Sequence, residues 1–498
     1  MSDESGVEPV NGSAQPTGRR AHRVSPQAGT RGIPRRSALR YAAGGLLLAG
    51  GAAGGAAWLL NDGSSPAGSE AVSHNPPPPP PGGPAPVWSE QFQPGHSWVA
   101  GGVGTASADV NDRTMFTRGA QSARVTTDGS GRQAFLRRAG MPAIDLTAKM
   151  IRLVLRVEDV AHLRQLAFYV GTRAFSNYFS WEFHTHSAEG ANYVQSGEWV
   201  VIHLQWADIT KASGAFSISE TGVPSVTTGF TDMSFAAYDD NAGPVTVRLQ
   251  AVEVLPDTST KFPRGVVSIT FDDSFASVYD LAQPVMQAHG FAGTMYNIAE
   301  AVGTSRYLTL KQMRDMQDRS GWEMAGHAYS TSAHDASYSQ LTSRQVDADF
   351  GRLRSWLDAN RLHSTHFAYP HGAFQATSDG VPVDHIAAQH FTTARSIIAE
   401  TVESLVPAMP HRLKALTGLT DGVGIDGSPL SLMLEPGGKL DRCAKNGDWL
   451  ILAFHQLVPG PPTAGTQISQ AGFAAVMDGI AARGIPVLTV GEAMSHFT

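Results

Sequence analysis

The sequence predicts a multidomain chain with two folded regions, an antiparallel β-sandwich of the jelly-roll type followed by a domain of alternating strands and helices. Residues 88–257 alternate apolar and polar positions with a period of two, which is typical of half-buried strands. In residues 264–498, short apolar runs alternate with segments of period 3.6. That alternation indicates a parallel sheet covered by helices, either open or closed into a barrel. A length of 498 residues is sufficient for both domains.

The first 60 residues have the character of an export segment. Arg35 and Arg36 precede an Ala-, Gly- and Leu-rich run at 41–60, an order found in twin-arginine signals. The same run is long enough to be a membrane-spanning anchor. Residues 61–87 form a Pro/Gly/Ser-rich linker, in which six consecutive prolines at 76–81 favour an extended spacer. We therefore expect a secreted or cell-surface protein, either released or held at the membrane or cell wall.

Charge and cysteine content exclude several classes of function. The formal charge is −7, and the basic residues near the N-terminus leave the rest of the chain still more acidic, which argues against nucleic acid as a partner. Cys443 is the only cysteine, so an internal disulfide and a cysteine-based zinc cluster are both excluded. Any metal site must use histidines and carboxylates. The sequence does not indicate an oligomeric state.

Two strands of the first region are clear from their patterns. Residues 151–157 and 200–206 each place apolar side chains on one face. The apolar positions at 245–249 and 252–254 have opposite parity, so we expect a β-bulge near Gln250.

Aromatic residues in this region have two possible roles. Trp181, Trp199 and Trp206 could bind a glycan, as in the jelly-roll modules that accompany carbohydrate-active enzymes, which this region resembles in pattern. They could equally be core residues, and Trp206 lies on the apolar face of its predicted strand. His184 and His186 could bind a metal from one strand face, but two histidines without a third ligand are more often surface residues.

The second region predicts its elements in order. An apolar strand at 266–271 is followed by a helix at 278–288 and a strand at 291–298. Thr309 and Thr342 each precede a Gln by three residues, the pattern of a helix capping box. A last helix at 469–484 and a last strand at 485–490 complete the prediction.

Two adjacent carboxylates, Asp272 and Asp273, follow the strand at 266–271. Such a pair is costly unless a cation or a shared proton relieves the repulsion. One aspartate here could simply cap a helix. However, His327 and His455 also follow apolar strands, and parallel strands end at one edge of a sheet. We expect these side chains to form a site.

The order of four motifs resembles the NodB-homology polysaccharide deacetylases, carbohydrate esterase family four. The motifs are Thr270-Phe271-Asp272-Asp273, Gly326-His327, Phe367-Ala368-Tyr369-Pro370-His371-Gly372 and Trp449-Leu450-Ile451-Leu452-Ala453-Phe454-His455. The resemblance covers residues 264–498. It implies a deformed (β/α) barrel and the metal-dependent removal of acetyl groups from N-acetylated sugars.

The resemblance also implies a role for each motif residue. Asp273 and His327 would be metal ligands, and Asp272 would be the general base. His455 would be the general acid that protonates the departing amine. The backbone N–H of His371, at a position that usually carries Tyr, would stabilise the oxyanion. Zinc is the expected ion for a site of one Asp and two His, although other divalent ions fit the same ligands.

The third ligand departs from the family pattern. The second His of the family lies four residues after the first, where this chain has Thr331; the next histidine is His334. On a continuous helix, seven residues span about 10 Å. His334 can therefore complete the site only if residues 328–333 turn back. Water or another residue is the alternative third ligand.

Two further departures concern conformation and charge. Ser274 replaces the usual Gly, and Ala368 stands where many members have an Arg that pairs with the base. Arg395 could supply that charge, or it could form an ordinary surface ion pair. Asp448 is a candidate to orient His455.

These observations favour an exported metal-dependent N-deacetylase that acts on an N-acetylhexosamine polysaccharide. One alternative is a non-catalytic glycan-binding or adhesion protein with a degenerate barrel. A second is a NodB-like amidohydrolase for a small cyclic amide, which the export segment and the linker disfavour.

Overall fold

The computed structural model describes residues 84–183, 193–206, 216–257, 262–398 and 402–497. The predicted export segment and most of the predicted linker lie outside the described residues, as do His184 and His186. Among the helices that are described, none combines the length and the apolar character that crossing a membrane requires.

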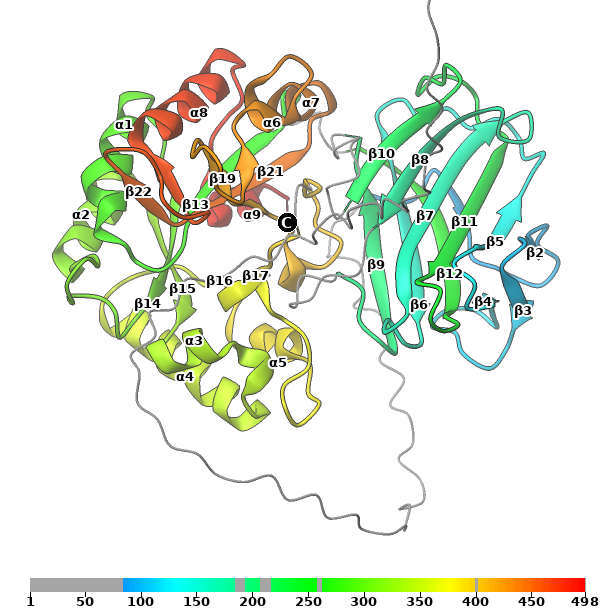
Figure 1. Ribbon diagram of the computed structural model, residues 1–498, viewed down its shortest axis with the longest axis horizontal. Helices are drawn as coiled ribbons and strands as arrows, with labels where there is room; N and C mark the ends of the chain where they lie inside the picture. The colour runs from blue at the N-terminus through cyan, green and yellow to red at the C-terminus, as the bar shows by residue number, and fades with distance from the viewer. Residues whose placement is uncertain (1–83, 184–192, 207–215, 258–261, 399–401, 498) are drawn as a thin grey trace, which may run out of the picture. The chain divides into compact units, whose positions relative to one another are not determined.

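The N-terminal folded region consists of two six-stranded sheets whose neighbouring strands run antiparallel (Figure 1). The first sheet has the order β3-β4-β12-β6-β9, with β1 also paired to β12, and the second has the order β10-β8-β7-β11-β5-β2. The strands are β1 (Trp88–Glu90), β2 (Val99–Gly101), β3 (Thr105–Asp112), β4 (Ser122–Thr127), β5 (Gln133–Arg138), β6 (Lys149–Val157), β7 (Leu163–Thr172), β8 (Asn177–Phe183), β9 (Glu198–Leu204), β10 (Phe216–Thr221), β11 (Asp232–Asp239) and β12 (Thr246–Pro256). The predicted antiparallel architecture is confirmed, whereas the jelly-roll connectivity stays a prediction.

The bulge predicted in the last strand of this region is also confirmed. The register between β12 and β6 shifts between Leu249 and Ala251, so Gln250 is the extra residue. Its side chain turns to the loop before β4, where its amide donates to the carbonyls of Arg118 and Gln121 at 3.1 Å each. The shift returns apolar side chains to the core on both sides of it.

Of the two interpretations of the three tryptophans, the structure supports the core one. Trp181 and Trp199 are each only 1% exposed, because both lie on the core side of their strands. Trp206 is partly buried, packs against Trp181 with 4.9 Å between ring centroids, and donates from Nε1 to the carbonyl of Lys149 at 2.7 Å. All three are core or core-edge residues.

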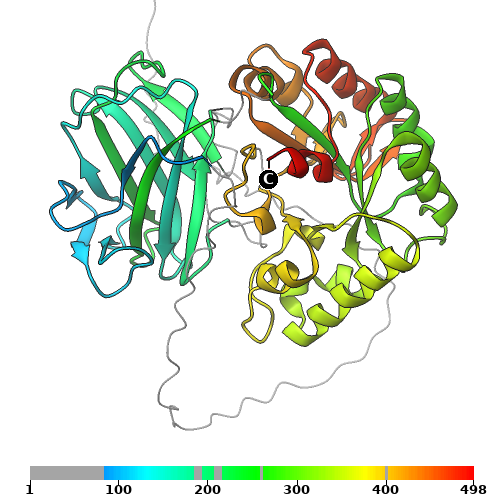
Figure 2. The same cartoon turned by 180° about the vertical axis from the view of Figure 1, so that it is seen from behind.

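The C-terminal region is built on a seven-stranded parallel sheet of order β17-β16-β15-β14-β13-β21-β18, curled into a half-barrel with α1, α2, α4 and α8 around its outside (Figures 1 and 2). Its strands are β13 (Val266–Phe271), β14 (Thr294–Ile298), β15 (Glu323–Ala328), β16 (His366–Ala368), β17 (Thr393–Arg395), β18 (Leu416–Thr417) and β21 (Trp449–Phe454). Strands β13 and β21 are buried along their whole length, as expected where helices cover a parallel sheet. Two small parallel ladders accompany it, β19 (Leu419–Thr420) with β20 (Ser428–Pro429) and β22 (Gln456–Val458) with β23 (Gln467–Ser469).

The helices of this region are short, and several begin where the sequence predicts. They are η2 (Val278–Ala282), α1 (Gln283–Ala288), α2 (Leu310–Ser320), α3 (Thr331–Ala336), η3 (Tyr338–Gln340), α4 (Ser343–Ala359), η4 (Pro370–Gly372), α5 (Val383–His390), η5 (Pro410–Arg412), α6 (Ser431–Leu434), α7 (Lys439–Asn446), α8 (Gln470–Ala482) and α9 (Val490–Phe497). Thr309 and Thr342 form the two predicted capping boxes. The last strand predicted at 485–490 is wrong: Val487 makes a single bridge to Val267, and α9 starts at Val490.

Candidate metal centre and active site

The predicted site residues converge at the edge where the parallel strands end. Asp272 and Asp273 follow β13, His327 lies near the end of β15, Arg395 ends β17 and His455 follows β21. Parallel neighbours place their carboxyl ends at one edge, so residues far apart in the chain meet there.

An unusual turn presents Asp273. Asp273 and Ser274 both have left-handed backbone angles, with φ of 71° and 63°. Such angles are unfavourable for residues other than glycine, and Ser274 occupies the position where the resemblance expects glycine. The Ser274 hydroxyl donates to Asn297 Oδ1 at 3.2 Å and accepts from the N–H of Ile298 at 3.0 Å. These contacts to β14 hold the turn, so the serine keeps the geometry that a glycine would adopt freely.

Three possible metal-ligand atoms lie close together, one each from Asp273, His327 and His334. Asp273 Oδ1 lies 3.1 Å from His334 Nε2 and 3.5 Å from His327 Nε2, and the ligand atoms of the three residues all lie within 4.8 Å of one another. His327 donates from Nδ1 to the carbonyl of Ala368 at 2.8 Å, which orients the ring so that its Nε2 faces Asp273. One carboxylate oxygen and two imidazole nitrogens are a donor set that fits zinc and related divalent ions.

Asp273 and the histidines beside it shift one another's pKa values. Burial alone would raise the pKa of Asp273, but hydrogen bonds from His327 and His334 hold it well below its ordinary range. Burial would likewise lower the pKa of His334, yet the Asp273 carboxylate raises it to about 9. Metal binding at this site would therefore compete with protonation of His334.

The close approach of His334 depends on a residue that sequence reasoning missed. The backbone N–H groups of Tyr329 and Ser330 donate to the Asp349 carboxylate at 2.9 and 3.1 Å, and the Tyr338 hydroxyl donates to it at 2.7 Å. These bonds turn the chain after β15 and fix both sides of α3, which carries His334. The signal in the sequence was an acidic residue within the apolar stripe of α4, where Asp349 is 5% exposed.

Asp272 has a separate set of partners. It is 1% exposed, and both of its oxygens accept from Arg395 Nη2 at 2.6 Å. Arg395 is itself fully buried, with its guanidinium carbon 5.1 Å from the ring centroid of Tyr296. His455 Nε2 lies 3.8 Å from Asp272 Oδ2. The structure thus places Arg395, the predicted substitute for the absent arginine at position 368, directly against Asp272.

His371 lies at the rim of the site and contributes more than the backbone group predicted for it. Its φ of 57° is left-handed, and its Nε2 donates to the carbonyl of His334 at 3.1 Å. The ring centroids of His334 and His371 are 5.4 Å apart. The side chain of His371 therefore helps to fix the helix turn that carries His334.

The prediction that Asp448 orients His455 is wrong. Asp448 precedes β21 and His455 follows it, so a six-residue extended strand separates them by roughly 20 Å. The carbonyl of Asp448 instead accepts from the N–H of Val266 at 3.0 Å, at the opposite end of the sheet from the site.

Comparison with known proteins assigns a class to part of this region. Residues 259–384 match the family model described as polysaccharide deacetylase. This stretch, which contains Asp272, Asp273, His327, His334 and His371, is therefore a domain of the NodB-homology, carbohydrate esterase family four type, as its motifs predicted.

The chain is also similar to particular proteins over part of its length. The chain is 30% identical over 113 residues to YxkH of Bacillus subtilis (strain 168), named as a polysaccharide deacetylase, covering 22% of this chain and 37% of that protein. It is 25% identical over 122 residues to the poly-beta-1,6-N-acetyl-D-glucosamine N-deacetylase of Staphylococcus epidermidis (strain ATCC 35984), covering 22% of this chain and 42% of that protein. The chain thus spans less than half the length of either relative. A solved family 4 acetyl xylan esterase from Clostridium thermocellum aligns with a TM-score of 0.30 at 16% identity, over 46% of this chain and 91% of that one.

Proposed function

We propose that this protein is a metal-dependent polysaccharide N-deacetylase, which hydrolyses the N-acetyl groups of an N-acetylhexosamine polymer. One observation carries the proposal: the Asp273–His327–His334 cluster lies beside a second, separately neutralised group of Asp272, Arg395 and His455. A donor set for a divalent ion next to an acid–base pair is what amide hydrolysis requires.

Asp273, His327 and His334 would hold the ion. When bound, a divalent cation supplies a lowered pKa for water and polarises the acetyl carbonyl. Asp272 accepts the proton of the attacking water, and Arg395 orients the Asp272 carboxylate through its two 2.6 Å contacts. His455 donates a proton to the departing amine, and the backbone N–H of His371 stabilises charge on the acetyl oxygen.

Zinc is the ion we propose, because imidazole and carboxylate donors suit it. The substrate class is supported by the relative from Staphylococcus epidermidis, whose name specifies an N-acetylglucosamine polymer. We also propose that the protein works outside the cytoplasm, released or held at the membrane or cell wall by its N-terminal segment. That placement rests on the twin arginines and the proline-rich linker of the sequence.

The test measures metal content and acetate release together. Purified full-length protein is stripped with a chelator, reloaded with zinc, and incubated with chitooligosaccharides, poly-β-1,6-N-acetylglucosamine, peptidoglycan and acetylated xylan. We expect acetate release from at least one N-acetylated polymer, lost on stripping and restored on reloading. Asp273→Ala should lose both the ion and turnover, whereas His455→Ala should keep the ion and lose turnover by about 100-fold or more.

His363→Ala is the matched control, because His363 is exposed and has no role in the site. A His455→Ala variant that also loses the ion would show that the roles are wrongly assigned. A zinc-loaded protein that releases no acetate from any of the polymers would favour the alternative, a non-catalytic glycan-binding protein.

A further inference from the structure

The second sheet of the N-terminal region has an aromatic surface on the side away from its core. Tyr178 of β8, Tyr169 of β7, Tyr238 of β11 and Phe135 of β5 belong to it, together with Phe175 of the β7–β8 turn. We call these five residues the aromatic face. Tyr169, Phe175 and Tyr178 contact one another, with ring centroids 5.7 to 6.3 Å apart. None of the five belongs to the deacetylase site.

The strand register explains how the rings share one side. Tyr169 pairs with Ser234, Ala167 pairs with Ala236, and Gly171 pairs with Tyr178, so these side chains all project away from the core. Ala167 and Ala236 lie on this side yet are fully buried. Neighbouring side chains must therefore lie over them, and small residues beneath large rings produce a flat surface.

The turn that carries Phe175 is held in an unfavourable conformation. Arg173, Ala174 and Phe175 are three consecutive left-handed residues, with φ of 53°, 54° and 62°. The buried carboxylate of Asp232 stabilises the turn by accepting from the N–H of Ala174 at 3.0 Å. Gly171 makes room for the ring, since a Cβ there would lie 2.8 Å from Phe175 Cδ1. Strain of this kind persists where the surrounding structure enforces a particular side-chain position.

Polar groups are interleaved with these rings. The hydroxyls of Tyr169 and Tyr238 are 3.1 Å apart, and Gln133 donates to Tyr238 at 2.6 Å. Arg137 lies over Phe135 and Phe175, with its guanidinium carbon 4.1 and 4.9 Å from their centroids. The face therefore alternates ring surfaces with hydrogen-bonding atoms.

Two polar atoms on this side have no partner. Ser234 Oγ and Arg137 Nε are buried and form no hydrogen bond within the described part of the chain. Ser234 as a whole residue is 2% exposed. Ser234 and Arg137 pair across β11 and β5, so the two atoms belong to one spot between the rings. A buried polar group without a partner is costly, and a ligand hydroxyl could pair with these two atoms only if the side chains that cover them move.

We propose that the aromatic face binds a polysaccharide chain of neutral pyranose units. The C–H side of a pyranose ring packs on an aromatic ring, and its hydroxyls pair with tyrosine, amide and guanidinium groups, which are the groups that alternate here. Among the described strand positions on this side, Val99 of the edge strand β2 is the one large aliphatic residue, and hydrogen-bonding groups separate the rings. That alternation suits a hydroxylated chain. This binding is independent of the proposed deacetylase activity.

The experiment is affinity electrophoresis of the full chain in native gels that contain glycol chitin, hydroxyethylcellulose or barley β-glucan, with a chelator present so that no turnover occurs. We expect at least one polymer to retard the wild-type protein. Tyr178→Ala and Phe175→Ala should weaken that association at least 10-fold. Arg164→Ala should weaken it less; the exposed Arg164 guanidinium lies 5.3 Å from the Tyr238 ring and donates to the carbonyl of Gly131 at 3.1 Å.

Phe116→Ala is the matched control, because Phe116 is an exposed aromatic residue in a loop outside this face, and it should bind as wild type does. The proposal is overturned if none of the three polymers retards the wild type, or if Tyr178→Ala, Phe175→Ala and Arg164→Ala all migrate like Phe116→Ala. Acetate release from chitopentaose by the zinc-loaded variants should equal that of the wild type. Polymer retardation without any acetate release would refute the deacetylase proposal alone.

Discussion

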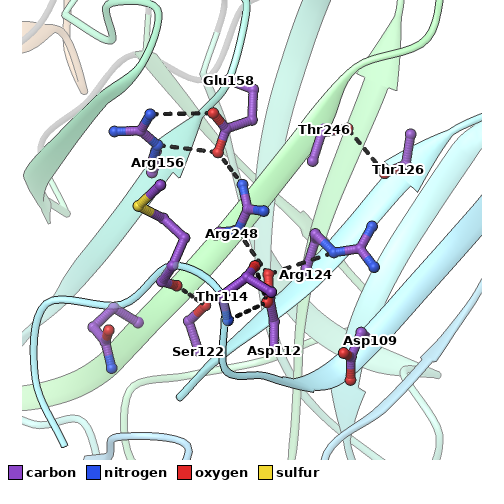
Figure 3. A network of polar contacts seen from close by, with 12 residues as sticks. Asp109, Asp112, Thr114, Ser122, Arg124, Thr126, Arg156, Glu158, Thr246 and Arg248 are labelled. Atoms are coloured by element: carbon purple, nitrogen blue, oxygen red, sulfur yellow. Dashed lines mark hydrogen bonds and ion pairs between the residues drawn. The ribbon is translucent and has the colours of Figure 1, made fainter. Parts of the chain in front are cut away.

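Buried carboxylates occur in two regions of this chain, and their partners differ. On the first antiparallel sheet, Asp112 lies between Arg248 at 2.7 Å and Arg124 at 3.4 Å (Figure 3). Glu158 of the same network accepts from Arg156 at 3.0 Å and also pairs with Arg248. Each acid there is balanced by permanently charged guanidinium groups.

Asp273 in the parallel region has no such partner. Its ion-pair partners among the described residues are His327 and His334, and imidazoles carry charge only when protonated. Its neighbour Asp272 is balanced by Arg395, as the sheet carboxylates are. Burial of an acid is thus a poor guide to function, whereas a carboxylate with two histidine nitrogens close to it and to each other, as at Asp273, fits a cation site.

The largest expected effect compares Asp273→Asn with Asp112→Asn. If Asp273 holds zinc and Asp112 does not, zinc at 100 times its dissociation constant should stabilise the wild type against unfolding by about 2.7 kcal/mol. Asp273→Asn should lose that gain, and Asp112→Asn should keep it. Thermal unfolding with and without zinc measures both, and equal zinc responses in the two variants would remove the distinction.

A smaller effect on zinc binding is expected when the contacts that hold α3 are weakened. Asp349→Asn weakens the bonds that turn the chain after β15, so zinc affinity should fall by about 10- to 100-fold, as is usual for groups behind a metal ligand. A competition titration with a chromophoric chelator measures it. The control is Asp347→Asn, an exposed acid on the same helix that pairs with His390. Unchanged affinity in Asp349→Asn would show that α3 is held by other contacts.

The smallest expected effect is the pH dependence of the sheet network. Burial alone would raise the pKa of Asp112, but hydrogen bonds from Thr114 and Arg248 lower it below its ordinary range. The folded state therefore binds this proton less tightly than the unfolded state. Its stabilisation is complete above the unfolded pKa of about 4 and is lost as the pH falls through the folded value.

Asp112→Asn should accordingly lower the free energy of unfolding by about 1 to 2 kcal/mol at pH 7, with a smaller difference from wild type at pH 3. Urea unfolding at the two pH values measures this difference. A difference that is the same at both values would mean that Asp112 acts through packing rather than charge. Zinc-dependent acetate release should be unaffected.

Local signals predicted much of the fold. The capping boxes at Thr309 and Thr342 and the apolar strand at 266–271 depend on neighbouring residues, and the structure reproduces each. The bulge at Gln250 followed from parity alone. Such features are set by backbone chemistry within a few residues, which a sequence displays directly.

Long-range features escaped prediction. The path of His334 depends on Asp349, fifteen residues further along the chain, and no local pattern connects them. In β8, alternation shows that Tyr178 and Trp181 lie on opposite sides but not which side meets the core. The sequence therefore left sugar contact and core packing both open for the tryptophans, and the tyrosine side went unnoticed.

Arg395 reaches Asp272 from β17, and in the sheet register its strand neighbour on β16 is Ala368, the position where the motif usually carries arginine. The guanidinium thus contacts Asp272 from the strand next to the position that the motif assigns to arginine. Inventories of enzymes based on motif letters alone would score this chain as defective at that position. Surveys of such domains, and attempts to redesign them, should therefore ask which charged side chains lie near the carboxylate in space. A residue on an adjacent strand can supply the same charge.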